Sequence, residues 1–145
     1  MALQLVQPHK FEVRTTSDSH FAWMRTRMAL ERTLMAWVRT AVSLIGFGFT
    51  IVQFFERFQS MSNVAVALRP QAPRYLGLAL IAAGVLALVV SLFQYRSVVH
   101  YIWSNDFAPI AGTGESGKKS PLYMISIVLI LIGVFAFVAV LTRAL

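Results

Sequence analysis

The stretch Leu34–Phe55, LMAWVRTAVSLIGFGFTIVQFF, is an apolar run that contains a single charged residue, Arg39. A helix rises about 1.5 Å per residue, so a helix of this length crosses a hydrocarbon core of roughly 30 Å. The stretch therefore predicts a transmembrane helix and decides the class of the protein.

The rest of the chain is typical of the same class. Hydrophobic residues make up 57% of the 145 residues, charged residues only 13%, and the mean hydropathy is +0.66. Tyr75–Tyr95 carries no charge, and Leu122–Leu141 follows Pro121, a residue suited to the first turn of a helix. We predict an all-α integral membrane protein with three transmembrane helices, at about residues 34–55, 75–95 and 122–141.

The basic residues set the expected orientation. Most of them precede the first span or lie between the second and third: Lys10, Arg14, Arg25, Arg27, Arg32, Arg96, Lys118 and Lys119. Because cytoplasmic segments are enriched in Lys and Arg, the N-terminus is predicted to be cytoplasmic and the C-terminus periplasmic. We interpret residues 1–16 as a flexible cytoplasmic tail, residues 17–145 as one membrane domain, and residues 97–120 as its cytoplasmic loop.

Several classes of site are not expected. The chain has no cysteine and its three histidines are far apart, so neither a metal site nor a bound cofactor is predicted. No nucleophile, base or paired-carboxylate arrangement indicates an enzyme. The segment Gly112–Ser120, GTGESGKKS, approaches the phosphate-loop pattern, but Lys119 stands where the pattern needs a hydroxyl and a membrane span follows. The basic residues lie where orientation requires them, so nucleic-acid binding is not predicted.

A repeated dipeptide leads into the first span. Arg25, Arg32 and Arg39 are seven residues apart, and each is followed by threonine. On a helix they lie nearly on one face, about 21 Å from first to last. We predict a basic amphipathic helix that leads into the span, with its polar face continued by Ser43, Thr50 and Gln53.

Two interpretations of this face remain open. Three spans are too few to enclose a polar channel, so self-association would keep the face from lipid and create a basic vestibule for anions. Alternatively, Arg39 extends its side chain to the interface, the other arginines bind anionic lipid headgroups, and the polar groups hydrogen-bond between helices.

Other residues are predicted to have structural roles. Glu31 is expected to pair with Arg27 one turn back, or with an arginine of a neighbouring subunit. Small residues recur every seven positions in the second and third spans and predict close helix packing. They are Gly77, Gly84, Ser91, Ser126 and Gly133.

The segment Leu30–Phe49 resembles the YidH-like family of small bacterial inner-membrane proteins, whose domain is called domain of unknown function 202. The resemblance rests on Glu31, Arg32, Thr33, Ala36, Trp37, Arg39 and Thr40, followed by Gly46 and Gly48. Leu30 departs from the pattern, which usually has asparagine at this position.

The family domain is similar to the membrane portion of the vacuolar transporter chaperone complex, in which several three-helix units surround a path for polyphosphate. The resemblance therefore implies that Arg32 and Arg39 face an anion path. Our leading hypothesis is a homo-oligomeric protein of the bacterial inner membrane that binds or conducts an anion, with phosphate or polyphosphate implied by the resemblance. The alternative is a non-transporting scaffold or assembly subunit that binds anionic lipid and a partner membrane protein.

Overall fold

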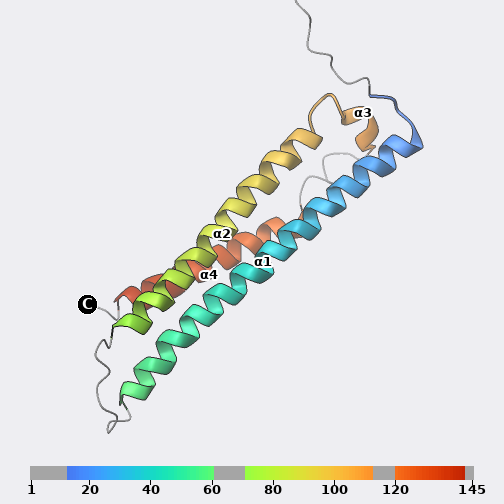
Figure 1. Ribbon diagram of the computed structural model, residues 1–145. Helices are drawn as coiled ribbons and strands as arrows, with labels where there is room; N and C mark the ends of the chain where they lie inside the picture. Colours follow the sequence, from blue (N-terminus) through green and yellow to red (C-terminus); the bar gives the residue numbers. More distant parts are fainter. Residues whose placement is uncertain (1–12, 61–70, 113–119, 143–145) are drawn as a thin grey trace, which may run out of the picture.

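The computed structural model describes residues 13–60, 71–112 and 120–142, and this part of the chain is helical and contains no strand (Figure 1). The helices are α1 (Ser17–Ser60), α2 (Ala72–Ile102), α3 (Ala108–Ala111) and α4 (Pro121–Thr142). Three of them, α1, α2 and α4, are long and apolar enough to cross a membrane. The predicted all-α fold with three spans is confirmed, and the chain is a multi-pass membrane protein.

Helix α1 is much longer than the span predicted within it. It has 44 residues, which corresponds to about 66 Å, twice the thickness of a hydrocarbon core. Its first turn is capped by Thr16, whose Oγ1 accepts a hydrogen bond of 3.2 Å from the backbone N–H of Ser19. Residues 17–33 thus belong to the same continuous helix as Leu34–Phe55.

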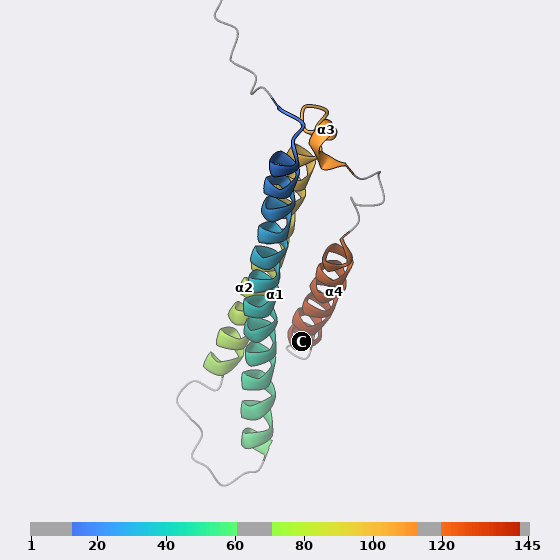
Figure 2. The ribbon, with the colours of Figure 1, turned by 90° about the vertical axis from the view of Figure 1, so that its right-hand side faces the viewer.

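Helices α1 and α2 run antiparallel and side by side (Figures 1 and 2). Glycines permit this close approach, because an added Cβ at Gly84 would lie 2.8 Å from the carbonyl oxygen of Ala41. Further along, a Cβ at Gly77 would lie 2.7 Å from the carbonyl oxygen of Gly48. The glycines of α2 therefore let the α1 backbone approach closely, and the side chains of Ile45 and Val52 pack over them.

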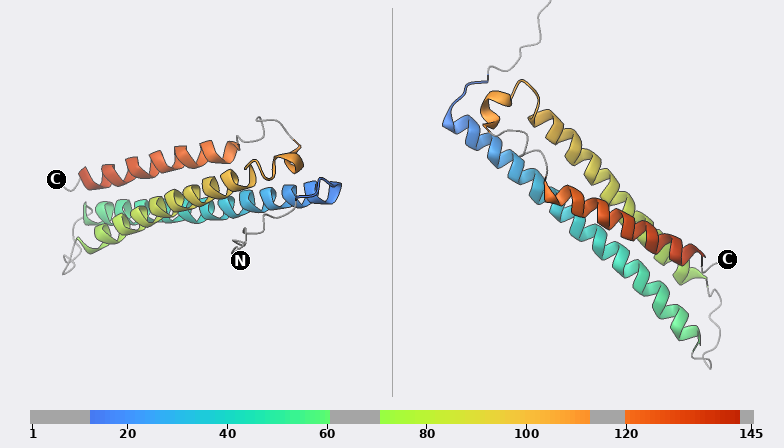
Figure 3. Two further views of the ribbon diagram at one scale, coloured as in Figure 1. Left: turned by 90° about the horizontal axis from the view of Figure 1, so that it is seen from above. Right: turned by 180° about the vertical axis from the view of Figure 1, so that it is seen from behind.

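Helix α4 packs beside this pair (Figure 3). An added Cβ at Gly133 would lie 2.7 Å from Val85 Cγ2 and 2.9 Å from Ile45 Cδ1, so α4 contacts both other spans. At its C-terminal end, Arg74 Nη2 donates a hydrogen bond of 2.6 Å to the carbonyl oxygen of Val140. This contact satisfies a carbonyl that the helix itself cannot pair.

The first part of α1 and the last part of α2 extend beyond the start of α4 (Figures 1 and 2). We call this region the stalk; it comprises residues 17–33, residues 96–102 and α3. Its core contains Trp23, Ile102 and Ala111. His20 Nδ1 donates a hydrogen bond of 2.6 Å to the carbonyl oxygen of Ile110, which attaches α3 to α1.

The region predicted as a cytoplasmic loop, 97–120, contains ordered helix at its start. Helix α2 continues through it to Ile102, because Ile102 and Trp103 pack against Trp23 of α1. Helix α3 follows and ends at Ala111, and Gly112 directly after it has a φ of 62°. Residues 1–12 and 113–119 lie outside the described residues, and with them most of the predicted tail and of the near-phosphate-loop segment.

Candidate functional site

The side of α1 that contacts α2 repeats every seven residues. Leu34, Ala41 and Gly48 are all buried along it. Consecutive helical residues are rotated by about 100°, so a residue two positions earlier lies nearly on the opposite side. Arg32 and Arg39 stand two positions before Leu34 and Ala41, and the α1–α2 contact therefore turns both of them away from α2.

The three arginines of the repeat are all exposed, and we call Arg25, Arg32 and Arg39 the arginine face. Each lies about 10.5 Å along the helix from the next. Within the described part of the chain none of them forms an ion pair. The monomer thus presents three uncompensated charges on one face of α1.

The threonines of the repeat are satisfied within the helix. The hydroxyls of Thr26, Thr33 and Thr40 donate to the carbonyl oxygens four residues earlier, at distances of 3.0, 3.0 and 3.1 Å. Ser43 and Thr50 bond in the same way, at 2.9 and 2.8 Å. These five residues are exposed, but their hydroxyls need no partner from outside the helix.

Two further stripes on α1 flank the arginine face. Sequence interpretation recognised neither as a stripe, although it assigned Ser43 and Thr50 to the polar face. The apolar stripe consists of large exposed side chains at intervals of seven: Phe21, Met28, Met35, Val42 and Phe49. The small stripe consists of exposed short side chains at the same interval: Ala22, Ala29, Ala36, Ser43 and Thr50. The seven-residue interval that revealed the arginines was also the signal for these stripes.

The arginines lie between the two stripes. On a helix with 3.5 residues per turn, Ala22 is about 103° from Phe21, and Arg25 is about 51° from Phe21 in the same direction. The same relationship holds for Met28, Ala29 and Arg32. The free side of α1 therefore has large apolar, basic and small side chains in parallel rows.

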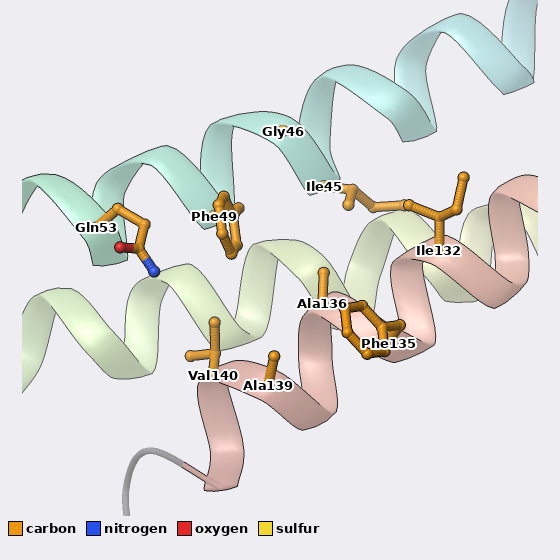
Figure 4. A pocket seen from close by; sticks show the side chains of 9 residues that line it. All are labelled: Ile45, Gly46, Phe49, Gln53, Ile132, Phe135, Ala136, Ala139 and Val140. Atoms are coloured by element: carbon orange, nitrogen blue, oxygen red, sulfur yellow. The ribbon is translucent and has the colours of Figure 1, made fainter.

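Gln53, the third predicted polar lining residue, lies at a groove between α1 and α4 (Figure 4). The groove has a volume of about 520 Å³, and its walls include Phe49 from α1 and Ala136 and Val140 from α4. The Gln53 amide points into it, and the structure gives this amide no hydrogen-bond partner among the described residues. Gln53 is the one polar side chain in an apolar lining.

Glu31 lies close to Arg27 on the neighbouring turn. Their Oε1 and Nε atoms are 3.7 Å apart, and the side chains are 32% and 28% exposed. The Arg27 guanidinium also lies over the Trp23 ring, 6.0 Å from its centre. The structure therefore places this pair beside the stalk core and not on the arginine face.

The small residues singled out in α2 and α4 all lie buried between helices. This group consists of Gly77, Gly84, Ser91, Ser126 and Gly133. The Ser91 hydroxyl donates to the Leu88 carbonyl at 3.0 Å, and the Ser126 hydroxyl to the Leu122 carbonyl at 2.8 Å. Each serine thus packs like a small apolar residue, with its polar group satisfied locally.

Among residues 13–60, 71–112 and 120–142, no three His, Cys, Asp or Glu side chains gather in a way that could hold a metal ion. The arginine face offers guanidinium groups, which bind carboxylates and phosphates through paired hydrogen bonds.

Comparison with known families gives one match. A family model described as "Domain of unknown function (DUF202)" matches residues 22–101. The matched segment contains the arginine face and almost all of α2, including the glycines at the α1–α2 contact. Neither the curated proteins nor the solved structures include a match.

Proposed function

The chain belongs to the DUF202 family, and from this premise we propose that it is a non-enzymatic, homo-oligomeric membrane protein whose arginine faces form a basic vestibule that binds or conducts anions. The observation that supports this proposal most strongly is that Arg25, Arg32 and Arg39 are exposed on the side of α1 opposite the α2 contact.

The position of Arg39 supports association. It lies about 7.5 Å inside the predicted span, counted from Leu34, on a side that α2 does not cover. A charged side chain at the centre of a membrane costs about 2.5–3.5 kcal/mol, and somewhat less near the surface. If several copies turned their arginine faces towards a common axis, the arginines would contact water and anions instead of lipid. This arrangement would avoid the cost.

The charge arrangement supports an anionic ligand. In a symmetric oligomer each arginine would become a ring of positive charge, with rings about 10.5 Å apart. Such rings concentrate anions at an entrance and repel cations. Guanidinium groups bind phosphate oxygens particularly well. Together with the resemblance to the vacuolar transporter chaperone membrane domain, this favours phosphate or polyphosphate as the anion.

The proposed location is a bacterial inner membrane with the N-terminus in the cytoplasm. The excess of Lys and Arg before the first span and between the second and third supports this orientation. The vestibule, formed by the α1 helices, would then open towards the cytoplasm, where phosphorylated solutes are abundant.

One observation favours the scaffold alternative. The hydroxyls of Thr40, Ser43 and Thr50 are bonded inside α1, so these residues tolerate an apolar neighbour and do not require a wet lumen. In a scaffold, Arg39 would reach the interface along its own aliphatic stem and bind a lipid phosphate.

Anion flux distinguishes the two functions. Purified protein is reconstituted in liposomes, and phosphate and chloride efflux are measured for the wild type, Arg32→Gln and Arg39→Gln. The matched control is Arg96→Gln, which removes one exposed charge from α2. We expect wild-type flux that both α1 variants reduce and the control retains. No flux from the wild type, or equal flux from all four proteins, contradicts conduction.

A further inference from the structure

We propose that neighbouring copies join through α1, with the apolar stripe of one copy packed against the small stripe of the next. This inference rests on the proposed function, because it names the surfaces through which the oligomer forms. Both stripes are exposed, and they share the seven-residue interval of the arginine face that lies between them.

Lipid cannot contact the apolar stripe along its whole length, so part of the stripe faces water unless a protein surface packs against it. Phe21 and Met28 are 55% and 52% exposed and belong to the stalk, which lies outside the predicted span. Large apolar side chains exposed to water are unfavourable, at roughly 25 cal/mol per Å². A protein surface that follows α1 beyond the predicted span, which begins at Leu34, would cover them.

The small stripe is the complementary surface on the same helix. It has the same interval and length as the apolar stripe, and each of its residues directly follows an apolar one: Ala22 after Phe21, Ala29 after Met28 and Ala36 after Met35. Short side chains leave depressions that the large side chains of a parallel neighbour can fill. One copy therefore offers projections and the next offers matching depressions.

This pairing determines where the arginines point. Arg25, Arg32 and Arg39 lie about midway between the two stripes, so a copy with one neighbour on each stripe turns its arginines towards the space that all copies share. The contact joins two different surfaces, which is the kind of interface that closes into a ring. A two-fold contact of apolar stripe on apolar stripe would leave the small stripe unused.

The area of one contact favours a closed ring over an isolated pair. From Phe21 to Phe49 the apolar stripe is about 42 Å long, and a helix contact is about 10 Å wide, which gives about 420 Å² on each partner. One contact thus buries about 840 Å² over both partners, less than the roughly 1,200–2,000 Å² of stable soluble complexes, but each copy in a ring makes two such contacts. Phe49 also lines the α1–α4 groove, so the neighbouring helix would reach that groove as well.

Disulfide cross-linking in the stalk tests the pairing directly, because the natural chain has no cysteine. The variants are Met28→Cys, Ala29→Cys and the double variant Met28→Cys/Ala29→Cys, in the full-length chain and in native membranes. Adjacent cysteines in one helix have Cα atoms about 3.8 Å apart, too close for the usual 4.4–6.8 Å of a disulfide. The control pairs Met28→Cys with Phe93→Cys, at an exposed position on α2.

We expect a ladder of cross-linked oligomers from the double variant, and at most weak dimers from the single variants and the control pair. Strong dimers from Met28→Cys alone would indicate two-fold contact and overturn the pairing. If no variant cross-links while native mass spectrometry shows an oligomer, the pairing is wrong but the proposed function stands. A monomer in lipid would overturn both.

Discussion

Arg39 and Ala41 are two residues apart in α1 and lie on opposite sides of it: Ala41 is fully buried against α2, whereas Arg39 is exposed. The seven-residue repeat extends this relationship to Arg32 and Leu34. The helix is thus divided lengthwise into one side that holds the subunit together and another that remains free for ions, lipid or a second copy.

The buried side should be intolerant of even one added methyl group. Gly84→Ala places a Cβ 2.7 Å from Ile45 Cγ1 and 2.8 Å from the Ala41 carbonyl oxygen, so the helices must separate. We expect a loss of about 1–3 kcal/mol in the free energy of unfolding. Thermal unfolding in detergent micelles, followed by circular dichroism, measures this loss.

Gly46→Ala is the matched control on the free side, where a Cβ would meet no atom within 4 Å. Because alanine favours a helix over glycine by about 0.5–1 kcal/mol, this variant should unfold at the same temperature as the wild type or slightly higher. Equal destabilisation by the two substitutions would show that α1 and α2 do not pack closely at Gly84.

The stalk should depend on one hydrogen bond between distant parts of the chain. Trp23 Nε1 donates to the carbonyl oxygen of Ile102 at 2.9 Å, in a buried position. Trp23→Phe keeps most of the ring but loses the donor, which should cost about 1–3 kcal/mol. Hydrogen exchange should accelerate in residues 17–33 and 96–102 and remain unchanged in the spans.

Trp37→Phe serves as the control for the stalk, since Trp37 is 46% exposed and outside the stalk core. It should leave hydrogen exchange in the stalk unchanged. The same protection of the stalk in the wild type and in Trp23→Phe would contradict the role assigned to this bond.

Filling the small stripe should weaken the oligomer without unfolding the subunit. Ala29→Leu adds a large side chain at an exposed position, so the monomer has room for it, whereas a close neighbour does not. Native mass spectrometry should show more monomer. Ala83→Leu makes the same change at an exposed position of α2 and should leave the distribution unaltered.

Glu31 distinguishes pairing within a subunit from pairing between subunits. Its contact with Arg27 is long and about one third exposed, so Glu31→Gln should change the free energy of unfolding by less than about 1 kcal/mol. We expect an unchanged oligomer as well. A large shift towards monomer would mean that Glu31 pairs with an arginine of a neighbouring copy instead.

The spans could be predicted from the sequence because each is an apolar run of about 20 residues, bounded by charges or proline and long enough to cross a membrane. The small residues of α2 and α4 were predictable for a similar reason, since glycine or serine at intervals of seven in a span favours close helix packing.

The stalk was not predictable. Its core joins Trp23 to Ile102 and Ala111, residues far apart in the chain, and nothing local in residues 97–102 indicated that α2 would continue.

The sequence predicted that the three arginines share one face of a helix, but it did not predict which residues and helices lie around that face. Periodicity placed Arg25, Arg32 and Arg39 together, and only the packing of α2 and α4 showed which side of α1 remains uncovered. The internal hydrogen bonds of Thr40, Ser43 and Thr50 also depend on side-chain conformation, which periodicity does not specify.

Whether the arginine face borders water is tested most directly at Gly46, which lies seven residues after Arg39 on the same face and has open space around an added Cβ. The variant Gly46→Cys carries the single thiol of the chain and is treated, in membranes, with anionic and cationic membrane-impermeant thiol reagents of similar size. Phe93→Cys, exposed on α2, is the lipid-facing control.

We predict that Gly46→Cys reacts with both reagents, and faster with the anionic one, because the arginines raise the local concentration of anions. Adding Arg39→Gln should reduce that preference, and Phe93→Cys should not react. A Gly46→Cys protein that remains unreactive, or that reacts without preference for the anionic reagent, would contradict a wet, basic vestibule.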